Sequence, residues 1–419
     1  MGLRVQRMLA LVSLVIFAAV IDASAPNDWP EFRGPTGQGV SDSATPPLEW
    51  DQTKNVTWKR PMPGTGWSSP VLYEGALYLT TALDDGGDNL ESLRALRVNS
   101  ETGEILWDVE LFHIGGRSQK HPKNGYASPT PIVEDGRLYV HFGPMGTACL
   151  DTSGKVIWRQ STLAYDTPHG NGGSPVLHGG KLIFSCDDTN APFIVALSQE
   201  TGDVAWKTVR RTDASKKFSF STPLVVEEKG RALAVSVGSG FVGAFDIADG
   251  KEVWRVDYGE GFSIVPRPVF SHGLIFVTTG FIRPCSIYAI RTGGEGDVTE
   301  THVAWTSGDG SPHTPSMIAL GDELYFVSDR GEFSCVDVET GSVHWREDIG
   351  GKYSASLVYA DGRIYATSEE GTTTVVAAGK TFQKLAENVL GERTFASPAL
   401  SGSAIFIRTE STLYRIDAP

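Results

Sequence analysis

Short segments of alternating hydrophobic and polar residues cover most of the chain, and one pattern among them returns five times. In residues 101–107 a polar turn with a glycine is followed by a short segment that contains a tryptophan. The tryptophan follows the glycine by four positions in every copy, at Gly103 and Trp107, Gly154 and Trp158, Gly202 and Trp206, Gly250 and Trp254, and Gly341 and Trp345. Glycine readily takes the positive φ of a tight turn. The pattern predicts a hairpin whose second strand carries a buried indole.

A second pattern alternates with the first one. An opening residue, usually small and in most copies followed by proline, starts a short strand; a turn with glycine and another alternating strand come next. The eight openings are Ser69-Pro70, Ser128-Pro129, Ser174-Pro175, Thr222-Pro223, Arg267-Pro268, Thr314-Pro315, Ala355-Ser356 and Ser397-Pro398. They recur about every 47 residues, the length of one four-stranded propeller blade. We therefore predict an all-β fold, a single eight-bladed β-propeller of four-stranded antiparallel blades.

The two ends of the chain test whether this ring closes. After Ser397 strands are predicted only at residues 404–408 and 412–416, so the eighth blade lacks its outer strand. Residues 55–59 form one strand too many before the first opening. We predict that this N-terminal strand completes the last blade, which leaves no open edge in the ring. The outer strands then carry Trp58, Trp107, Trp158, Trp206, Trp254, Trp305, Trp345 and, in place of a tryptophan, Leu385. A seven-bladed ring is the alternative.

Composition agrees with this fold and excludes several functions. The 47 glycines and 23 prolines among 419 residues suit short strands joined by turns. A hydrophobic fraction of 40% excludes intrinsic disorder. The formal net charge is −14, which repels phosphates at long range and argues against nucleic acid or an anionic membrane as a partner.

The N-terminal residues predict export. Arg4 and Arg7 precede an apolar run at residues 8–21, which is too short to span a bilayer and is followed by small residues. We expect a signal peptide at residues 1–23, an extended leader at 24–54 and the propeller at 55–419; an uncleaved anchor is the alternative. No cysteine directly follows the apolar run, so we do not expect a lipid-anchored mature protein. No second apolar segment of spanning length occurs. The expected location is the periplasm or the medium.

Motifs for catalysis and metal binding are lacking in the sequence. Cys149, Cys186, Cys285 and Cys335 are far apart, with no C-x-x-C and no haem-attachment motif. We expect them to be small buried hydrophobic residues, although export would permit disulfides. The sequence also has no phosphate-binding loop, no H-E-x-x-H and no nucleophile elbow. No catalytic, cofactor-binding or metal-binding residue is therefore assigned.

The hairpin pattern resembles the A-x-D-x-x-T-G-x-x-x-W repeat of the PQQ-type (pyrroloquinoline quinone) β-propeller family, over about residues 55–417. This family includes quinoprotein alcohol dehydrogenases and non-catalytic BamB-like scaffolds of outer-membrane protein assembly. Residues 28–35, Asp-Trp-Pro-Glu-Phe-Arg-Gly-Pro, also resemble the opening of a large exported branch of such proteins. The resemblance implies the fold, because the repeat residues are packing residues.

The dehydrogenase branch implies chemistry that this sequence does not match. Those enzymes hold the quinone against a ring of two adjacent, disulfide-bonded cysteines, and here no two cysteines are adjacent. They also place Glu, Asn and Asp around Ca²⁺, with an Asp as base, and no set with that spacing is found. Residues 84–88 and the pair Asp187-Asp188 are acidic, but we interpret both as solvated loops. We expect a non-catalytic binding or scaffold protein without a cofactor; a PQQ- and calcium-dependent alcohol or sugar dehydrogenase is the alternative.

Ring geometry predicts where a binding site would lie. The loops before the eight openings emerge on one face, around the mouth of the central channel. They hold Trp67, Lys123, Asn124, Tyr126, His169, Asn171, Phe220, Arg267, His313, Lys352, Tyr353, Arg393 and Phe395. Such aromatic and cationic residues suit an anionic or sugar-like small ligand, or an envelope protein.

Seven of these residues are the candidate binding set: Tyr126, His169, Asn171, Arg267, His313, Tyr353 and Arg393. Arg267 and Arg393 would take an anionic group, and Tyr126 and Tyr353 would stack on a ring. His169 and His313 belong to the third and sixth blades, too far apart to share a metal ion, so no transition-metal site is expected. The loop at residues 112–127 is long and basic, with Arg117, Lys120, His121 and Lys123.

Overall fold

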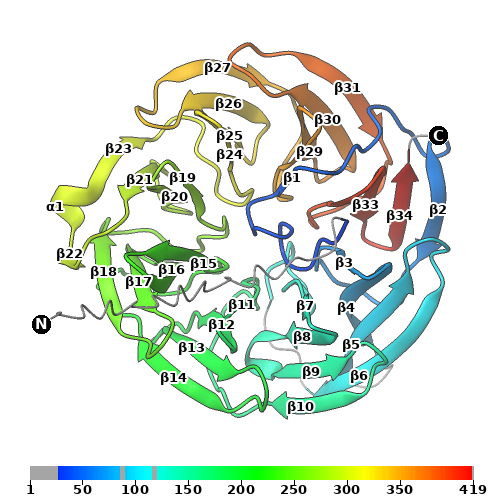
Figure 1. Cartoon of the computed structure of the whole chain (residues 1–419), viewed down its shortest axis with the longest axis horizontal. Coiled ribbons are helices and arrows are strands. Elements are labelled where there is room, and N and C mark those ends of the chain that lie inside the picture. Colours follow the sequence, from blue (N-terminus) through cyan, green and yellow to red (C-terminus); the bar gives the residue numbers. More distant parts are fainter. Residues whose placement is uncertain (1–26, 85–89, 116–119, 418–419) are drawn as a thin grey trace, which may run out of the picture.

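Eight β-sheets stand in a ring around a central channel (Figure 1). The computed structural model describes residues 27–84, 90–115 and 120–417. The predicted signal peptide, most of the acidic segment 84–88 and Arg117 lie outside the described residues.

The first four blades follow each other in chain order, and each begins with its innermost strand. Their strands are β3 (Val71–Tyr73), β4 (Ala76–Asp84), β5 (Leu90–Asn99) and β6 (Ile105–Gly115) in blade 1; β7 (Ile132–Glu134), β8 (Arg137–His141), β9 (Thr147–Asp151) and β10 (Val156–Gln160) in blade 2; β11 (Val176–His178), β12 (Lys181–Cys186), β13 (Phe193–Ser198) and β14 (Val204–Val209) in blade 3; and β15 (Leu224–Glu228), β16 (Arg231–Gly238), β17 (Phe241–Asp246) and β18 (Glu252–Asp257) in blade 4.

The last four blades complete the circle. Their strands are β19 (Val269–Ser271), β20 (Leu274–Thr278), β21 (Ile287–Arg291) and β23 (Val303–Ser307) in blade 5; β24 (Ile318–Leu320), β25 (Glu323–Val327), β26 (Glu332–Asp337) and β27 (Val343–Asp348) in blade 6; β28 (Val358–Ala360), β29 (Arg363–Thr367), β30 (Thr372–Ala377) and β31 (Lys384–Val389) in blade 7; and β32 (Ala399–Ser401), β33 (Ala404–Arg408), β34 (Thr412–Asp417) and β2 (Val56–Pro61) in blade 8. Short additional elements are β1 (Val40–Ser41), β22 (Gly296–Asp297), α1 (Thr299–His302) and a 3₁₀ turn (Gly143–Met145).

The predicted closure is confirmed. The N-terminal strand β2 pairs antiparallel with β34, so that Trp58 lies opposite Arg415 and Lys59 opposite Tyr414. Eight four-stranded antiparallel blades result, and the seven-bladed alternative is wrong. Two blades gain a fifth, parallel strand: β1 joins the inner edge of blade 7 and β22 the outer edge of blade 4.

The repeated glycine and tryptophan belong to a contact between neighbouring blades. The indole N–H of Trp58, in blade 8, donates to the carbonyl of Ser100 in the turn of blade 1 over 3.0 Å. A Cβ on Gly103 of that turn would lie 2.8 Å from the Trp58 ring, and Gly103 has a φ of +70°. Glycine is therefore required at this position for two reasons: the turn needs a positive φ, and a side chain would collide with the indole. The indoles of Trp107, Trp158, Trp206, Trp305 and Trp345 donate in the same way to the following blade, at Thr152, Gln199, Ile247, Val338 and Gly379.

Two blades depart from this contact because the following blade lacks the normal turn. Blade 7 carries Leu385 instead of a tryptophan; in blade 8 the third and fourth strands come from opposite ends of the chain, so no hairpin turn joins them. Trp254 of blade 4 faces the enlarged turn of blade 5. Its indole N–H donates instead to the buried carboxylate of Glu228 at 3.2 Å, and that carboxylate also accepts the N–H of Gly293.

A belt of hydrogen bonds links the openings of the innermost strands. In this belt the backbone N–H of one opening residue donates to the hydroxyl of the opening residue in the next blade, over 2.9–3.1 Å. The donor and acceptor pairs are Ser69 and Thr130, Thr130 and Ser174, Ser174 and Thr222, Arg267 and Ser316, Ser316 and Ser356, Ser356 and Ser397, and Ser397 and Ser69. The final bond joins the first and last blades, and the belt is interrupted where Arg267 replaces a hydroxyl residue.

The belt also corrects three openings, and in blade 7 the opening residue is Ser356, one position after the predicted Ala355. In blades 2 and 6 the opening residues are Thr130 and Ser316, each two positions after the predicted Ser128 and Thr314. In both blades a proline, Pro129 or Pro315, precedes the true opening and imitates the pattern. In seven of the eight blades the opening residue is a Ser or Thr two positions before the inner strand, and its hydroxyl accepts from the preceding blade.

Replacing Trp58 by Ala should lower the free energy of unfolding by about 3 kcal/mol, because the indole fills the contact that joins the last blade to the first. Chemical denaturation followed by tryptophan fluorescence measures this loss. The matched control is Lys59→Ala on the same strand, which is exposed and should change stability by less than about 0.5 kcal/mol. A loss below about 1 kcal/mol for Trp58→Ala would mean that the closing strand contributes little.

Candidate functional site

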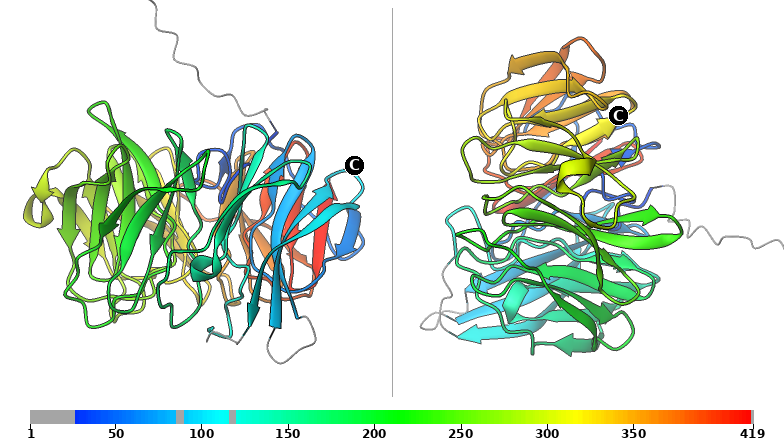
Figure 2. Two further views of the ribbon diagram at one scale, coloured as in Figure 1. Left: turned by 90° about the horizontal axis from the view of Figure 1, so that it is seen from below. Right: turned by 90° about the vertical axis from the view of Figure 1, so that its left-hand side faces the viewer.

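The leader lies across one face of the ring and enters the central channel. In Figure 1 it is the dark blue segment in front of the channel, and Figure 2 shows it on one side of the disc. Its backbone or side chains hydrogen-bond to Leu72 in blade 1, Val133 in blade 2, Phe270 in blade 5, Tyr359 in blade 7 and Gly402 in blade 8. We call this side the leader face and the opposite side the mouth face. The leader therefore crosses this face of the ring and is held by five of the eight blades.

Arg267 of the candidate set is the main anchor of the leader. Its guanidinium donates to the carbonyl of Phe32 at 2.7 Å and lies 3.3 Å from the carboxylate of Glu31. It also donates to the carbonyl of Pro223 in blade 4. A Cβ on Gly37 would lie 2.2 Å from this guanidinium, so the leader wraps closely around it. With only 2% of its surface exposed, Arg267 is a structural residue and does not present a charge to a ligand.

A second buried arginine, Arg33, sits beside this pair. It donates to the carbonyls of Gln38 and Met317, while its Nε and Nη1 have no partner among the described residues. Burial, together with the charge of Arg267, lowers the pKa of Arg33 to about 9. Burial also disfavours the charged form of Glu31 and raises its pKa, although the charge of Arg267 acts in the opposite direction. Arg267 thus pairs with the Glu31 carboxylate, whereas the neighbouring Arg33 has only backbone carbonyls as acceptors.

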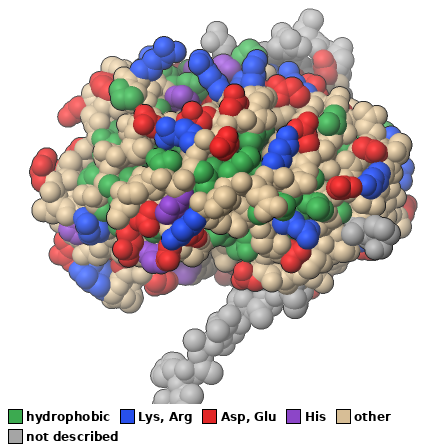
Figure 3. Space-filling model, turned by 90° about the horizontal axis from the view of Figure 1, so that it is seen from above, with side chains coloured by type: hydrophobic (Ala, Val, Ile, Leu, Met, Phe, Trp, Pro, Cys, Tyr) green, Lys and Arg blue, Asp and Glu red, His purple; other side chains and the backbone are tan. Residues whose placement is uncertain are grey.

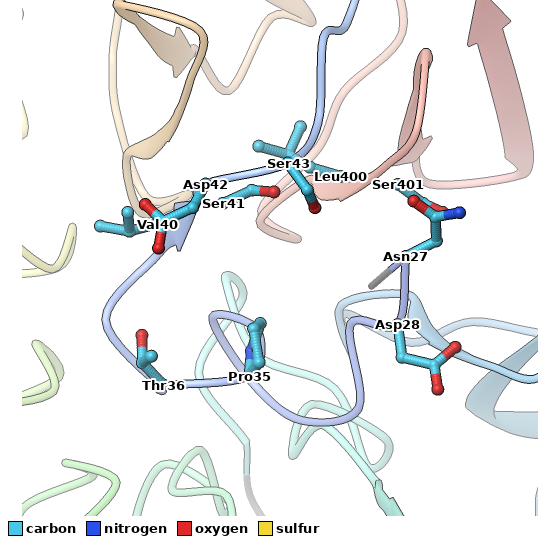
Figure 4. A pocket seen from close by; sticks show the side chains of 10 residues that line it. All are labelled: Asn27, Asp28, Pro35, Thr36, Val40, Ser41, Asp42, Ser43, Leu400 and Ser401. Atoms are coloured by element: carbon cyan, nitrogen blue, oxygen red, sulfur yellow. The ribbon is translucent and has the colours of Figure 1, made fainter. Parts of the chain in front are cut away.

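The leader face has a small polar pocket of about 160 Å³ (Figure 4). Seven of its ten lining residues carry a hydroxyl, amide or carboxylate group; the ten are Asn27, Asp28, Pro35, Thr36, Val40, Ser41, Asp42, Ser43, Leu400 and Ser401. Asp28 already accepts the N–H of Glu74. Within residues 27–84, 90–115 and 120–417, no cluster of three or more His, Cys, Asp or Glu is arranged to hold a metal ion.

On the mouth face, three residues of the candidate set are buried. Tyr126, Asn171 and Tyr353 expose only 3%, 6% and 1% of their surfaces. Tyr126 lies beneath the Lys120 ammonium, and Asn171 packs against Gly143 of blade 2. Burial raises the pKa of Tyr353 to about 12. These side chains support the mouth and do not offer a surface for stacking.

The other three candidates are accessible. The ring of His313 packs against that of Phe281, with ring centroids 4.8 Å apart. Nδ1 of His313 lies 3.4 Å from the carboxylate of Asp329. Arg393 has a side chain that is 46% exposed, and it lies over the rings of Trp67 and Phe395 at 5.4 and 4.8 Å. His169, also partly exposed, belongs to a separate group of aromatic residues with Phe218 and Phe220.

Contacts between the mouth loops reveal a residue that the sequence patterns did not indicate. Lys123 crosses the mouth to the carboxylate of Glu369 at 2.5 Å, and Glu369 belongs to a hairpin loop of blade 7. Trp67 and Phe395 pack at 4.6 Å beneath Lys123 and Arg393. The opening pattern could not predict Glu369, because the hairpins between second and third strands also reach this face and carry no opening.

His121 and His169 are also neighbours, with ring centroids 5.5 Å apart. Both come from loops before openings, so the sequence placed them on one face, but only the fold brings their rings together. The long basic loop is shorter than expected, because β6 continues to Gly115.

The groups that the quinoprotein enzymes use do not fit this ring. All four cysteines are free and buried, in four different blades. Asp187 is not a solvated loop residue as predicted: it is 4% exposed and pairs with the buried Arg210, and burial raises its pKa to about 6. Asp188 accepts the backbone N–H groups of Asp166, Asn190 and Ala191. Neither carboxylate is available as a calcium ligand.

The fold and this site define an eight-bladed β-propeller whose channel is crossed by the leader on one face. The chain belongs to the family described as outer membrane protein assembly factor BamB, which it matches over residues 94–347 and again over 238–418. In the part of the chain that the structure describes, no helix has the length and apolar character needed to cross a membrane.

Comparisons with individual proteins agree on the fold. An uncharacterised protein of Rickettsia conorii is 21% identical over 261 residues, 59% of this chain and 56% of that protein. BamB from Moraxella catarrhalis has a TM-score of 0.60 at 13% identity, covering 87% of this chain and 99% of that chain. A europium-containing methanol dehydrogenase has a TM-score of 0.57 at 11% identity, covering 94% and 98%. This chain spans 23% to 56% of the length of the curated relatives that it matches.

Arg267→Ala and Arg393→Ala should differ sharply in stability. Arg267→Ala leaves the buried Glu31 carboxylate and Phe32 carbonyl without their donor, and we expect a loss of about 3 kcal/mol. Arg393→Ala removes an exposed cation and should cost less than about 0.5 kcal/mol. Thermal unfolding by calorimetry compares the two; equal losses would show that the leader does not depend on Arg267.

Proposed function

We propose that the protein is an exported, non-catalytic scaffold of the periplasm or cell envelope, which binds a partner or small ligand at the mouth face. The observation that supports this most is the accessible group of Trp67, Phe395, Arg393 and Lys123 at the open end of the channel. Trp67 and Phe395 are half-buried, and aromatic rings with accessible cations over them are typical of binding surfaces. The partner expected is an envelope protein or an anionic or sugar-like ligand.

Support for the location comes from two sources. The sequence predicts a signal peptide at residues 1–23, and the family is named for an outer-membrane assembly factor. BamB from Burkholderia pseudomallei is 30% identical to this chain over 116 residues.

The alternative is a PQQ-dependent dehydrogenase. It is favoured by similarity to subunit 1 of a methanol dehydrogenase from Methylobacterium organophilum, 28% identical over 153 residues. Against it stand the separated cysteines and the engagement of Asp187 and Asp188 in other bonds. The side chains of this ring therefore favour the binding protein over the quinone enzyme.

Incubating the purified protein with PQQ and Ca²⁺ should yield no bound quinone after desalting and no dye-linked alcohol oxidation, because neither the paired cysteines nor a carboxylate set is in place. The absorbance spectrum and the dye assay measure this. Stoichiometric quinone with turnover would establish the dehydrogenase instead.

Capture from an envelope extract tests the mouth face as the working surface. Lys123→Glu with Arg393→Glu should reduce the protein captured by wild type at least about tenfold, since reversed rim charges repel a complementary partner. The control reverses Lys380 and Lys384, which lie near Glu323 and Glu387 away from the mouth. Quantitative mass spectrometry compares the captured proteins. Equal loss in both variants, or in neither, would show that the partner binds elsewhere.

A further inference from the structure

Four basic residues gather in one sector of the mouth face, on the loops that lead into blades 2, 3 and 4. We call Lys120, His121, His169 and Lys216 the basic sector. The backbone N–H of His121 donates to the carbonyl of His169 at 3.1 Å, and their rings are in contact. Lys120 packs beside Gly170: a Cβ added to Gly170 would lie 3.4 Å from the Cβ of Lys120. The charge of Lys216 acts on His169. The four side chains thus form one cluster.

The basic sector has no neutralising carboxylate. Across the described ranges, which omit residues 85–89 and 116–119, none of its members lies within ion-pairing distance of an Asp or Glu. The nearby Glu260 accepts the N–H and hydroxyl of Ser215 at 2.9–3.2 Å. Three other basic residues at the mouth are paired: Lys123 with Glu369, Arg393 with Glu410 and His313 with Asp329.

Aromatic rings hold these donors in position. The Lys120 ammonium lies 4.5 Å from the centre of the Tyr126 ring, and the Lys216 ammonium 3.9 Å from that of Phe262. Phe262 packs on Phe218, which contacts His169. Nδ1 of His121 accepts the N–H of Lys123 at 3.2 Å, so Nε2 carries the proton in the neutral ring. A cation over a ring face keeps N–H donors for a further acceptor, at a lower entropy cost than a free lysine.

We propose that the basic sector is a binding site for a small, multiply charged anion of the phosphate type. Like charges held together raise the energy of the empty site, and an anion removes that repulsion. Lysine and histidine serve as point-charge donors to phosphate. A group of several such donors suits a ligand with several negative charges better than a ligand with one carboxylate. The net charge of −14 repels large polyanions, which favours a small ligand over nucleic acid. The proposal rests on the mouth face being the binding surface.

Isothermal titration calorimetry of the purified protein with inorganic pyrophosphate, at low ionic strength and pH 6.5, tests the site. Lys120→Gln and Lys216→Gln should each weaken binding about fivefold, and together about 25-fold. Lys380→Gln with Lys384→Gln removes the same charge elsewhere and should stay within about twofold of wild type. Citrate should bind more weakly than pyrophosphate, and vesicles containing phosphatidylglycerol distinguish a lipid phosphate from a soluble one.

A second measurement does not depend on the variants folding well. Saturating pyrophosphate should raise the pKa of His169, which burial and then the charges of His121 and Lys216 hold below its usual value, as followed by NMR of the imidazole protons. An unchanged His169 titration, no heat of binding, or equal weakening in the control pair would each overturn the proposal. Because capture is tested at Lys123 and Arg393, normal capture without pyrophosphate binding would reject the anion site alone.

Discussion

The ring depends most on one contact, in which an indole from the outer strand of a blade lies on the turn of the following blade; six of the eight blades make it. This contact explains why glycine and tryptophan recur together although they never touch within one copy: Trp58 meets Gly103, and Trp107 meets Gly154. It also explains the two exceptions. Blade 8, which follows Leu385, has no hairpin turn between its third and fourth strands, and the tryptophan is absent there. Where the turn of the following blade is enlarged, Glu228 supplies the acceptor for Trp254. The repeated glycine and tryptophan therefore reflect contacts between neighbouring blades and not contacts within a single blade.

The inner belt and the leader are coupled through Arg267. Hydroxyl groups at the openings bind neighbouring blades but are too small to fill the channel. Where Arg267 replaces a hydroxyl, the belt is interrupted, and the guanidinium reaches both Pro223 of the preceding blade and Phe32 of the leader. The interruption is thus the point where the leader attaches. Burying Arg33 beside it costs desolvation energy, which the surrounding carbonyls offset only in part.

The sequence was sufficient for the fold because the packing residues themselves repeat. The repeat spacing alone assigns Trp58 and Leu385 to their blades, since it leaves one position for each. The site was less predictable. The partners of Arg267 come from the leader, more than 200 residues away in sequence, so no local pattern shows that its charge is already used. Glu369 reaches the mouth from a hairpin with no motif of its own, and burial of Tyr126 depends on packing that spacing does not reveal.

The leader lies across only one face of the ring, and the two faces therefore differ in chemistry. Around the axis, the leader face offers an oxygen-rich pocket with Asp28 and Asp42, whereas the mouth face offers ring-supported cations such as Lys120 and Arg393. Charges of both signs are interspersed on the outer edge seen in Figure 3, so that edge has no single preferred polarity. The leader thus makes the two faces of the ring chemically different, because it crosses the channel axis on one side only.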